Sequence, residues 1–224
     1  MSWRRLPEAT IWGAVLLLWL AFSIWSRDWG GALTPTEIDE LMAHLQVQAS
    51  AENSGIEASI DVIEEFMRSD DGEPFVMWNL FAFPEGDINH PKTGEPMPAA
   101  ELVQEYFAPF MGKLIARGGY PALSMRAVGG YIDHWNVPAD VRWSGAALIR
   151  YPSRRVLVEL AGDPEFEHLH LYKQLALERT LAFPAQRQFG LYMGLEHAVP
   201  VFLLIFGLLG HLLLLLRRRS RDAT

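Results

Sequence analysis

Hydrophobic positions divide the chain into two apolar runs near its ends and a patterned middle. The first run, from Ile11 to Trp25, carries no charge, and the second, from Ala198 to Leu216, is almost entirely Leu, Phe, Ile, Val and Gly. A helix that crosses a bilayer needs about 20 apolar residues, and tryptophans at its end suit the interface. We predict transmembrane helices at residues 11–27 and 197–216, with tails at residues 1–10 and 217–224.

The charges that flank the two runs predict their orientation. Arg4 and Arg5 precede the first run, and Arg217 to Arg219 follow the second. The positive-inside rule then places both termini in the cytoplasm, and in a bacterium it places the middle of the chain in the periplasm, anchored in the inner membrane. A cleaved signal peptide is the alternative for the first run, but the bulky residues at 23–25 do not suit a cleavage site.

Residues 28–73 show two stretches of helical periodicity. Thr34 and Glu37 flank a proline in the manner of a capping box. The second stretch carries Ile56, Ile60, Ile63, Phe66 and Met67. We predict two amphipathic helices that either pack on the following domain or bridge it to the membrane.

Residues 74–190 read as strand, helix, strand, strand, helix, strand. Strands are expected at 75–83, 123–128, 143–151 and 181–183, the last one short and at an edge; helices are expected at 99–115 and 163–179, with a short one capped by Ser153. Gly118 and Gly119 follow the first long helix as a left-handed cap would. The proline-rich segment 84–98 is expected to be an irregular loop.

This order predicts an α+β fold, a ferredoxin-like β-α-β-β-α-β domain flanked by an N-terminal and a C-terminal transmembrane helix. Two helices would cover one face of its sheet. The strands are too apolar for the other face to meet water, so a second copy of the chain is the expected partner.

Composition narrows the function classes. The net charge is −8, with the acidic residues in the middle, which argues against nucleic acid as a partner. The chain has no cysteine, and therefore no disulfide, thiolate metal site or Cys nucleophile. Neither a phosphate-binding loop nor a Ser-nucleophile or HExxH motif is present.

Several motifs together resemble a known superfamily. They are the strand with Phe75, Met77, Asn79 and Leu80, then Arg117-Gly118-Gly119, Arg150 to Arg154, Asp163 to Phe166, and Arg179. Residues 74–184 resemble the dimeric α/β-barrel superfamily, and most of all a short domain of unknown function with a Phe/Tyr-Pro-Ser-Arg signature. The resemblance implies a homodimer; members of the superfamily include haem-degrading and quinol-forming monooxygenases, and many proteins without known activity.

Polar residues within the apolar domain are the candidate ligand contacts. Asn79 interrupts an apolar strand, and the resemblance implies an amide that faces a substrate cavity. A pocket lined by Asn79, Trp78, His134 and Arg150 would favour an enzyme. Arg154, with Arg150 and Arg155, could grip a carboxylate or phosphate; alternatively these arginines pair with helix acids such as Glu159 and Glu165.

Histidines offer the remaining chemistry. His168 and His170 diverge by about 200° on a helix, so they cannot share a metal there. The resemblance implies that one of them could be a haem ligand; a solvated or hydrogen-bonded histidine is the alternative. His197 and His211 share a face of the second span, but the first span has no histidine to complete a haem site.

Three functions remain open at this stage. The first is a membrane-anchored extracytoplasmic binding or accessory protein, a homodimer or a subunit of a membrane complex, embedded in the lipid bilayer. The second is a small oxygenase or haem-type enzyme acting on an apolar, membrane-derived substrate. The third is a scaffold whose Gly207 and Gly210 let helices pack closely. No cofactor can be named, and no metal is expected.

Overall fold

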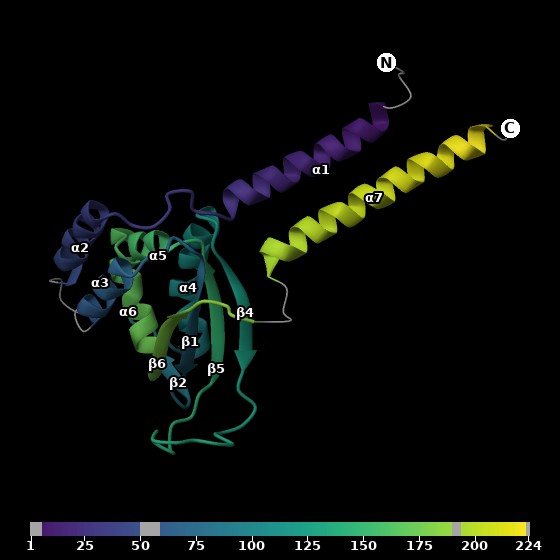
Figure 1. The fold of residues 1–224 in the computed structure, drawn as a ribbon. Coiled ribbons are helices and arrows are strands. Elements are labelled where there is room, and N and C mark those ends of the chain that lie inside the picture. Colours follow the sequence, from purple (N-terminus) through teal and green to yellow (C-terminus); the bar gives the residue numbers. More distant parts are fainter. Residues whose placement is uncertain (1–5, 50–58, 190–193, 223–224) are drawn as a thin grey trace. The chain divides into compact units, whose positions relative to one another are not determined.

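The computed structural model describes residues 6–49, 59–189 and 194–222 (Figure 1). These residues fall into two compact units. One contains the two ends of the chain, up to Arg27 and from Gln188, and the other is a central domain from Asp28 to Arg187. The two apolar end segments therefore belong to one unit and the central domain to the other.

The central domain is a mixed α+β structure with a four-stranded antiparallel sheet. Its strands are β1 (Phe75–Ala82), β4 (Tyr120–Arg126), β5 (Gly145–Tyr151) and β6 (Arg179–Ala185), in the spatial order β4-β5-β1-β6. β1 has a neighbouring strand on each side, and its side chains alternate between the face that the helices cover and the opposite face of the sheet.

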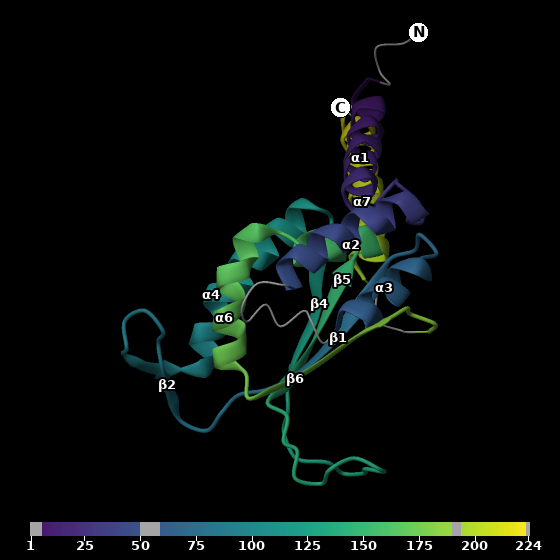
Figure 2. The same cartoon turned by 90° about the vertical axis from the view of Figure 1, so that its left-hand side faces the viewer.

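Two helices cover one face of this sheet (Figure 2): α4 (Ala99–Ala116) and α6 (Glu167–Ala176). The apolar stripe of α4 is buried at Leu102, Phe110, Met111 and Leu114. The expected glycine cap is present, since Gly118 has a φ of +82° and its N–H donates to the Ile115 carbonyl at 3.1 Å. The positive φ explains why glycine occupies this position.

A shorter helix, α5 (Arg154–Ala161), follows β5 and begins at its expected cap. The Ser153 hydroxyl accepts a hydrogen bond from the N–H of Val156. A 3-10 turn, η3 (Pro164–Phe166), then leads into α6. α6 ends at Ala176, earlier than the expected Arg179, because the chain leaves the helix to pair with β1 and Glu178 N–H already donates to the Ala82 carbonyl at 3.0 Å.

Two further expectations need correction. β6 does not stop before Pro184 but continues to Ala185, with Pro184 opposite Met77; an edge strand tolerates proline because one row of its N–H groups has no partner strand. The segment 84–98 is not wholly irregular, because β2 (Asp87–Asn89) and β3 (Pro96–Pro98) form a hairpin. His90 closes its turn by accepting the N–H groups of Lys92 and Thr93.

The segment before the sheet belongs to the same unit. Its helices α2 (Pro35–Ala49) and α3 (Ile60–Arg68) form a second core with α5, built by Leu33, Ile38, Met42, Leu45, Met67 and Val158. The capping box is present, since Thr34 N–H donates to Glu37 at 2.8 Å and Glu37 N–H donates to the Thr34 hydroxyl at 3.3 Å. Of the two alternatives, packing on the domain is the one observed; Ile56 lies outside the described residues.

The terminal unit contains α1 (Leu6–Trp25) and α7 (Leu195–Asp222), both long and apolar enough to cross a membrane by length and composition. The helices contact each other. Arg218 pairs with Glu8 at 2.6 Å, and Trp12 Nε1–H donates to His211 Nδ1 at 3.4 Å. A Cβ placed on Gly207 would lie 3.0 Å from Trp12 and 3.1 Å from Val15, so the glycine permits this close packing.

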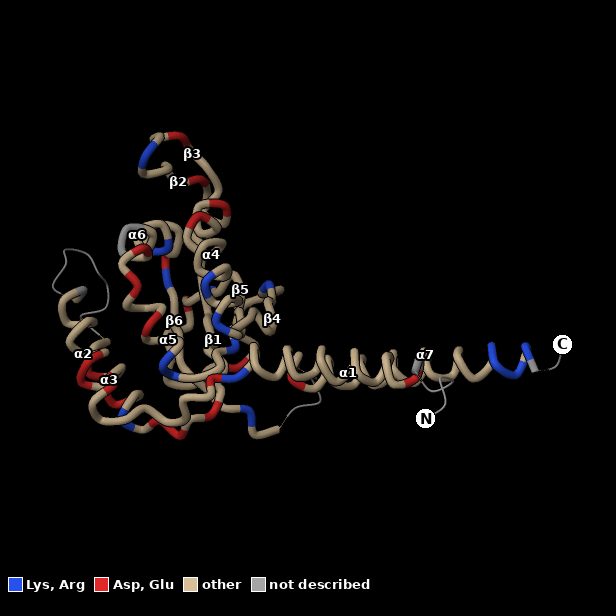
Figure 3. The backbone as a smooth tube through the Cα atoms, turned by 90° about the horizontal axis from the view of Figure 1, so that it is seen from above, with Lys and Arg blue, Asp and Glu red and all other residues tan. Residues whose placement is uncertain are grey.

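Charge is distributed unevenly along both units (Figure 3). Arginines gather at the C-terminal end of α7, while acidic residues follow α2 and α3. The Glu8–Arg218 pair joins the start of α1 to the end of α7. Within this unit the start of α1 and the end of α7 therefore lie at the same end of the helix pair.

Because the chain has no native cysteine, the helix pairing can be tested by cross-linking. A Val15→Cys/Gly207→Cys double variant should form an intrachain disulfide under mild oxidation, since the two side chains would be within bonding reach. Mass spectrometry of the membrane-extracted monomer measures the yield. Leu17→Cys/Gly207→Cys is the control, because Leu17 is 68% exposed on another face of α1. Equal yields in both variants would refute the pairing.

Candidate functional site

A cavity of about 380 Å³ lies inside the central domain, between the sheet and the helices that cover it. Most of its lining is apolar or aromatic. The sheet contributes Met77, Asn79, Phe81, Ser124, Ala147, Ile149, Thr180 and Ala182, and the helices contribute Val103, Tyr106, Phe107, Phe110, Phe166, His170 and Lys173, among others. Its size and composition are those of sites that enclose a small organic molecule.

The alternation of β1 determines which side chains reach this cavity. Met77, Asn79 and Phe81 point toward the helices, while Trp78 and Leu80 between them point to the opposite face of the sheet. Asn79 and Trp78 therefore cannot line the same cavity of one domain. The structure does not bring together the four residues of the expected pocket.

Asn79 is held by the backbone around it. Its Nδ2 donates to the carbonyl of Met77 at 3.0 Å and lies 3.4 Å from that of Ala147. Both neighbours are acceptors, which fixes the amide with its nitrogen toward the sheet. No donor within the described part of the chain is bonded to Asn79 Oδ1, so this oxygen is an acceptor available to the cavity.

His170 and Lys173 enter the cavity from α6, one turn apart. The His170 ring lies edge-on to Tyr106, with centroids 5.9 Å apart, and Lys173 Nζ lies 5.6 Å from the same Tyr106 ring. Burial lowers the pKa of His170, and the nearby Lys173 ammonium lowers it further. Burial also lowers the pKa of Lys173 and raises that of Tyr106 to about 12. At neutral pH, His170 is therefore a neutral imidazole and Tyr106 a neutral phenol.

Trp78 belongs to a second surface, the outer face of the sheet. Its ring stacks on Phe183 with centroids 6.3 Å apart and an interplanar angle of 4°. Phe183 is 45% exposed and Leu181 is 51% exposed. Leu80, Leu123, Met125 and Leu148 point to the same side by their register. We call this apolar set the outer sheet face.

His134 and Arg150 lie away from the cavity. His134 is exposed in the loop between β4 and β5, where its ring stacks on Tyr131 at 5.8 Å. Arg150 is buried at the end of β5, donates to the Gly118 carbonyl at 2.9 Å and lies over the Tyr120 ring. Arg150 therefore holds the turn after α4 against the sheet.

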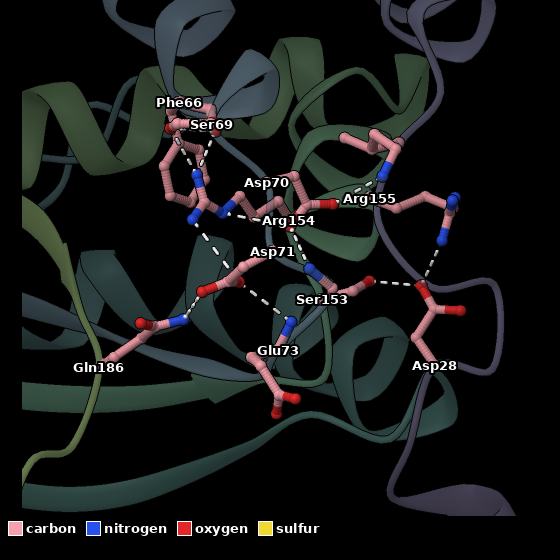
Figure 4. A network of polar contacts seen from close by, with 12 residues as sticks. Asp28, Phe66, Ser69, Asp70, Asp71, Glu73, Ser153, Arg154, Arg155 and Gln186 are labelled. Carbon is pink, nitrogen blue, oxygen red and sulfur yellow. Dashed lines mark hydrogen bonds and ion pairs between the residues drawn. The ribbon is translucent and has the colours of Figure 1, made fainter.

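Arg154 and Arg155 are occupied by acidic residues of the same domain (Figure 4). Arg154 Nε pairs with Asp70 at 3.2 Å, Nη2 approaches Asp71 at 3.7 Å, and the guanidinium stacks on Phe66 and donates to its carbonyl. Arg155 pairs with Asp28 at 2.8 Å and with Glu37 at 3.0 Å. These contacts support the alternative in which the arginines pair with acidic residues, and not the one in which they bind a ligand.

The expected partners of these arginines, Glu159 and Glu165, were wrong. Glu159 faces Arg117, and Glu165 pairs with Lys113. The acids that do bind Arg154 and Arg155 come from segments that precede the sheet. The spacing of residues along the sequence did not indicate that these segments fold back onto α5. Burial alone would raise the pKa of Asp28, but hydrogen bonds from Ser153, Gly30 N–H and Arg155 lower it overall. Asp28 therefore stays ionised at neutral pH.

The remaining histidine candidate cannot be placed by its side chain. His168 lies in α6, but its side chain is outside the described residues. Across residues 6–49, 59–189 and 194–222 no cluster of three His, Asp or Glu side chains could hold a metal ion.

Lys173 is the cavity residue that sequence reasoning missed. A signal was present, because Phe166, His170, Lys173 and Leu177 follow the i, i+4, i+7, i+11 spacing of a core-facing stripe. All four line the cavity. Two basic residues within such a stripe indicate a site more strongly than the spacing of His168 and His170.

Comparisons with known proteins give no function. No protein-family model matches the chain, and no curated protein sequence matches it. Among solved structures, RPA0582, a protein of unknown function from Rhodopseudomonas palustris, is 22% identical over 58% of this chain and 94% of its own, with a TM-score of 0.45. Methylated RPA0582 is 23% identical over 58% of this chain and 91% of its own, also with a TM-score of 0.45.

The buried pair of Arg154 and Asp70 should be structural. The Asp70 side chain is 1% exposed, so Arg154→Met would leave a buried carboxylate without its cation and lower the free energy of unfolding by on the order of 3 kcal/mol, roughly 10 °C in Tm. Thermal unfolding of the detergent-solubilised chain measures it. The control is Arg68→Met, which removes an arginine from exposed pairs and should leave Tm nearly unchanged. A similar Tm for both variants would leave Arg154 available for a ligand.

Proposed function

We propose that this chain is a membrane-anchored binding protein whose periplasmic, ferredoxin-like domain encloses a small apolar ligand. The cavity carries the proposal. It is lined by apolar and aromatic side chains and contains a few convergent polar groups, Asn79, His170 and Lys173. This is the composition that small-molecule sites share.

The strand order supports the ferredoxin-like assignment. In chain order the strands of the sheet are β1, β4, β5 and β6. In space the first of them lies between the third and the fourth, and the second lies beside the third at an edge. α4 lies between the first and second of these strands along the chain, and α6 between the third and fourth. The α1–α7 pair supports two spans with both chain ends on one side of the membrane, which is the cytoplasmic side by the arginine distribution.

The domain acts as a homodimer in this proposal, with two outer sheet faces in contact. Leu181, Phe183 and Met125 are 51%, 45% and 38% exposed, and together with Trp78 and Leu148 they form an apolar surface across all four strands. A two-fold contact would bury the same residues on both copies. Subunits of a membrane complex are the alternative occupants of this face.

A small oxygenase or haem-type enzyme is the second candidate, and one observation favours it. His170 offers a neutral imidazole to the cavity that the amide of Asn79 also lines. A Soret band in the absorption spectrum of the purified protein, lost in His170→Ala but not in His134→Ala, would favour this enzyme over the binding protein.

The cavity can be tested with two adjacent alanines of β5. Ala147 lines the cavity, whereas Ala146 lies opposite Leu80 on the outer sheet face. Ala147→Phe fills the cavity and should abolish co-purification of small molecules detected by mass spectrometry of the extracted protein, while Ala146→Phe should retain them. Circular dichroism checks that both variants fold. Retention of the same molecules by folded Ala147→Phe would contradict the proposal.

The dimer can be tested independently. Phe183→Glu places a charge on the outer sheet face and should convert the dimer to a monomer, because two carboxylates would be buried in the contact. Light scattering with size-exclusion chromatography in detergent measures the mass of the protein component. Leu171→Glu is the matched control, since Leu171 is 43% exposed on α6, on the helical side of the sheet. A wild-type monomer, or dissociation by both variants alike, would reject this interface.

A further inference from the structure

The cavity contains positive charge where a helix would normally present its apolar stripe. Phe166 lines it from η3, His170 and Lys173 from α6, and Leu177 from the position just after α6. The two ends of this stripe are apolar, as packing against a sheet requires. Its middle positions, His170 and Lys173, are basic. They interrupt the apolar stripe where the helix lines the cavity.

Among the described residues that line the cavity, no acid balances this charge. They include no Asp and no Glu, and His170, Lys173, Tyr106 and Tyr151 are their ionisable members. Among the ion pairs of the described residues none includes Lys173. The chain as a whole is acidic, with a net charge of −8. A basic cavity without acidic residues therefore contrasts with the rest of the chain.

The other lysines show that this arrangement is particular to Lys173. Lys113 also lies over an aromatic ring, that of Phe166, but it is paired with Asp163 at 2.6 Å and with Glu165 at 2.7 Å. Lys92 lies over the Tyr172 ring at 5.4 Å, but it is exposed in the β2–β3 turn. Lys173 alone of the three combines an apolar cavity with the absence of a carboxylate partner.

The physical consequence is an unbalanced cation. Lys173 is half-buried, and an ammonium partly removed from water without a counter-ion is unfavourable, so burial lowers the pKa of Lys173. The Tyr106 ring offsets part of this cost through a cation–π contact at 5.6 Å. An anion that enters the cavity would offset the rest, and the neutral His170 imidazole next to it can donate a further hydrogen bond.

We propose that Lys173 is the anion anchor of this cavity and that the ligand is a small apolar carboxylic acid. Its carboxylate would pair with the Lys173 ammonium, and its apolar body would lie among Met77, Phe107 and Phe110. One ammonium and one imidazole match a single negative charge better than a phosphate, which usually recruits several donors. This inference rests on the proposed ligand-binding function and adds the chemical class of the ligand.

Two probes that differ in charge alone test the anchor. Binding of 2-naphthoate and of 2-naphthamide to the full chain in phosphatidylcholine nanodiscs is measured by isothermal titration calorimetry, with empty nanodiscs as the blank. The wild type should bind naphthoate at least about tenfold more tightly than naphthamide. Lys173→Met should remove this preference and leave naphthamide binding within about threefold, whereas Lys92→Met should change neither.

Two further variants keep the outcome interpretable. Lys173→Arg preserves the charge and should keep the naphthoate preference. Lys173→Met should not lower Tm, because it replaces an unbalanced cation in an apolar cavity with an apolar side chain of similar length. If Lys173→Met does unfold, the preference in Lys173→Arg decides, and its loss with an intact fold counts against the anchor.

The results separate the anchor from the function on which it rests. Equal affinity for both probes, unchanged in Lys173→Met and lost in Ala147→Phe, would overturn the carboxylate anchor while the cavity remains a binding site. Failure of the wild type to bind either probe, or binding that survives Ala147→Phe, would count against both. A naphthoate preference that disappears in Lys173→Met alone supports both.

Discussion

The period-two alternation of β1 organises both candidate surfaces of the domain. Odd-numbered residues from Met77 to Phe81 line the cavity, and even-numbered residues such as Trp78 form the outer sheet face. Antiparallel pairing with β5 and β6 fixes this register on both sides of the strand. A slip by one residue would place Asn79 outside and Trp78 inside, so the strand pairing protects the site as well as the fold.

The cavity borders the main core of the domain, since Phe110 and Ile149 belong to both. One core joins β1, β5 and α4 around Phe75, Phe110, Leu114 and Ile149, and a second joins α2, α3 and α5. The arginines at the start of α5 tie the second core to the first through Asp28 and Asp70, both contributed by segments before the sheet. These arginines therefore support the architecture around the site, and the basic groups that line the cavity are His170 and Lys173.

The proposed membrane anchoring and the internal apolar cavity suit one another chemically. A ligand with an apolar body partitions into bilayers, and a protein carried by two membrane helices would meet it at high local concentration. An internal anchor for a carboxylate would then provide selectivity, because apolar contacts alone discriminate weakly between molecules of similar size.

The sequence by itself determined the two apolar ends, the order of the sheet strands and covering helices, the Thr34–Glu37 box and the glycine after α4, because each is encoded by contacts within a few residues. It also identified Asn79 as an exception in an apolar strand. Only the tertiary structure decided that Asn79 lines one cavity with His170 and Lys173, that Arg154 and Arg155 are paired with Asp70 and Asp28, and that Trp78, Arg150 and His134 lie elsewhere. Those outcomes depend on which face of a strand packs against which helix, and on which distant acidic residues pack against α5. Such contacts join residues far apart in the sequence, and local periodicity does not encode them.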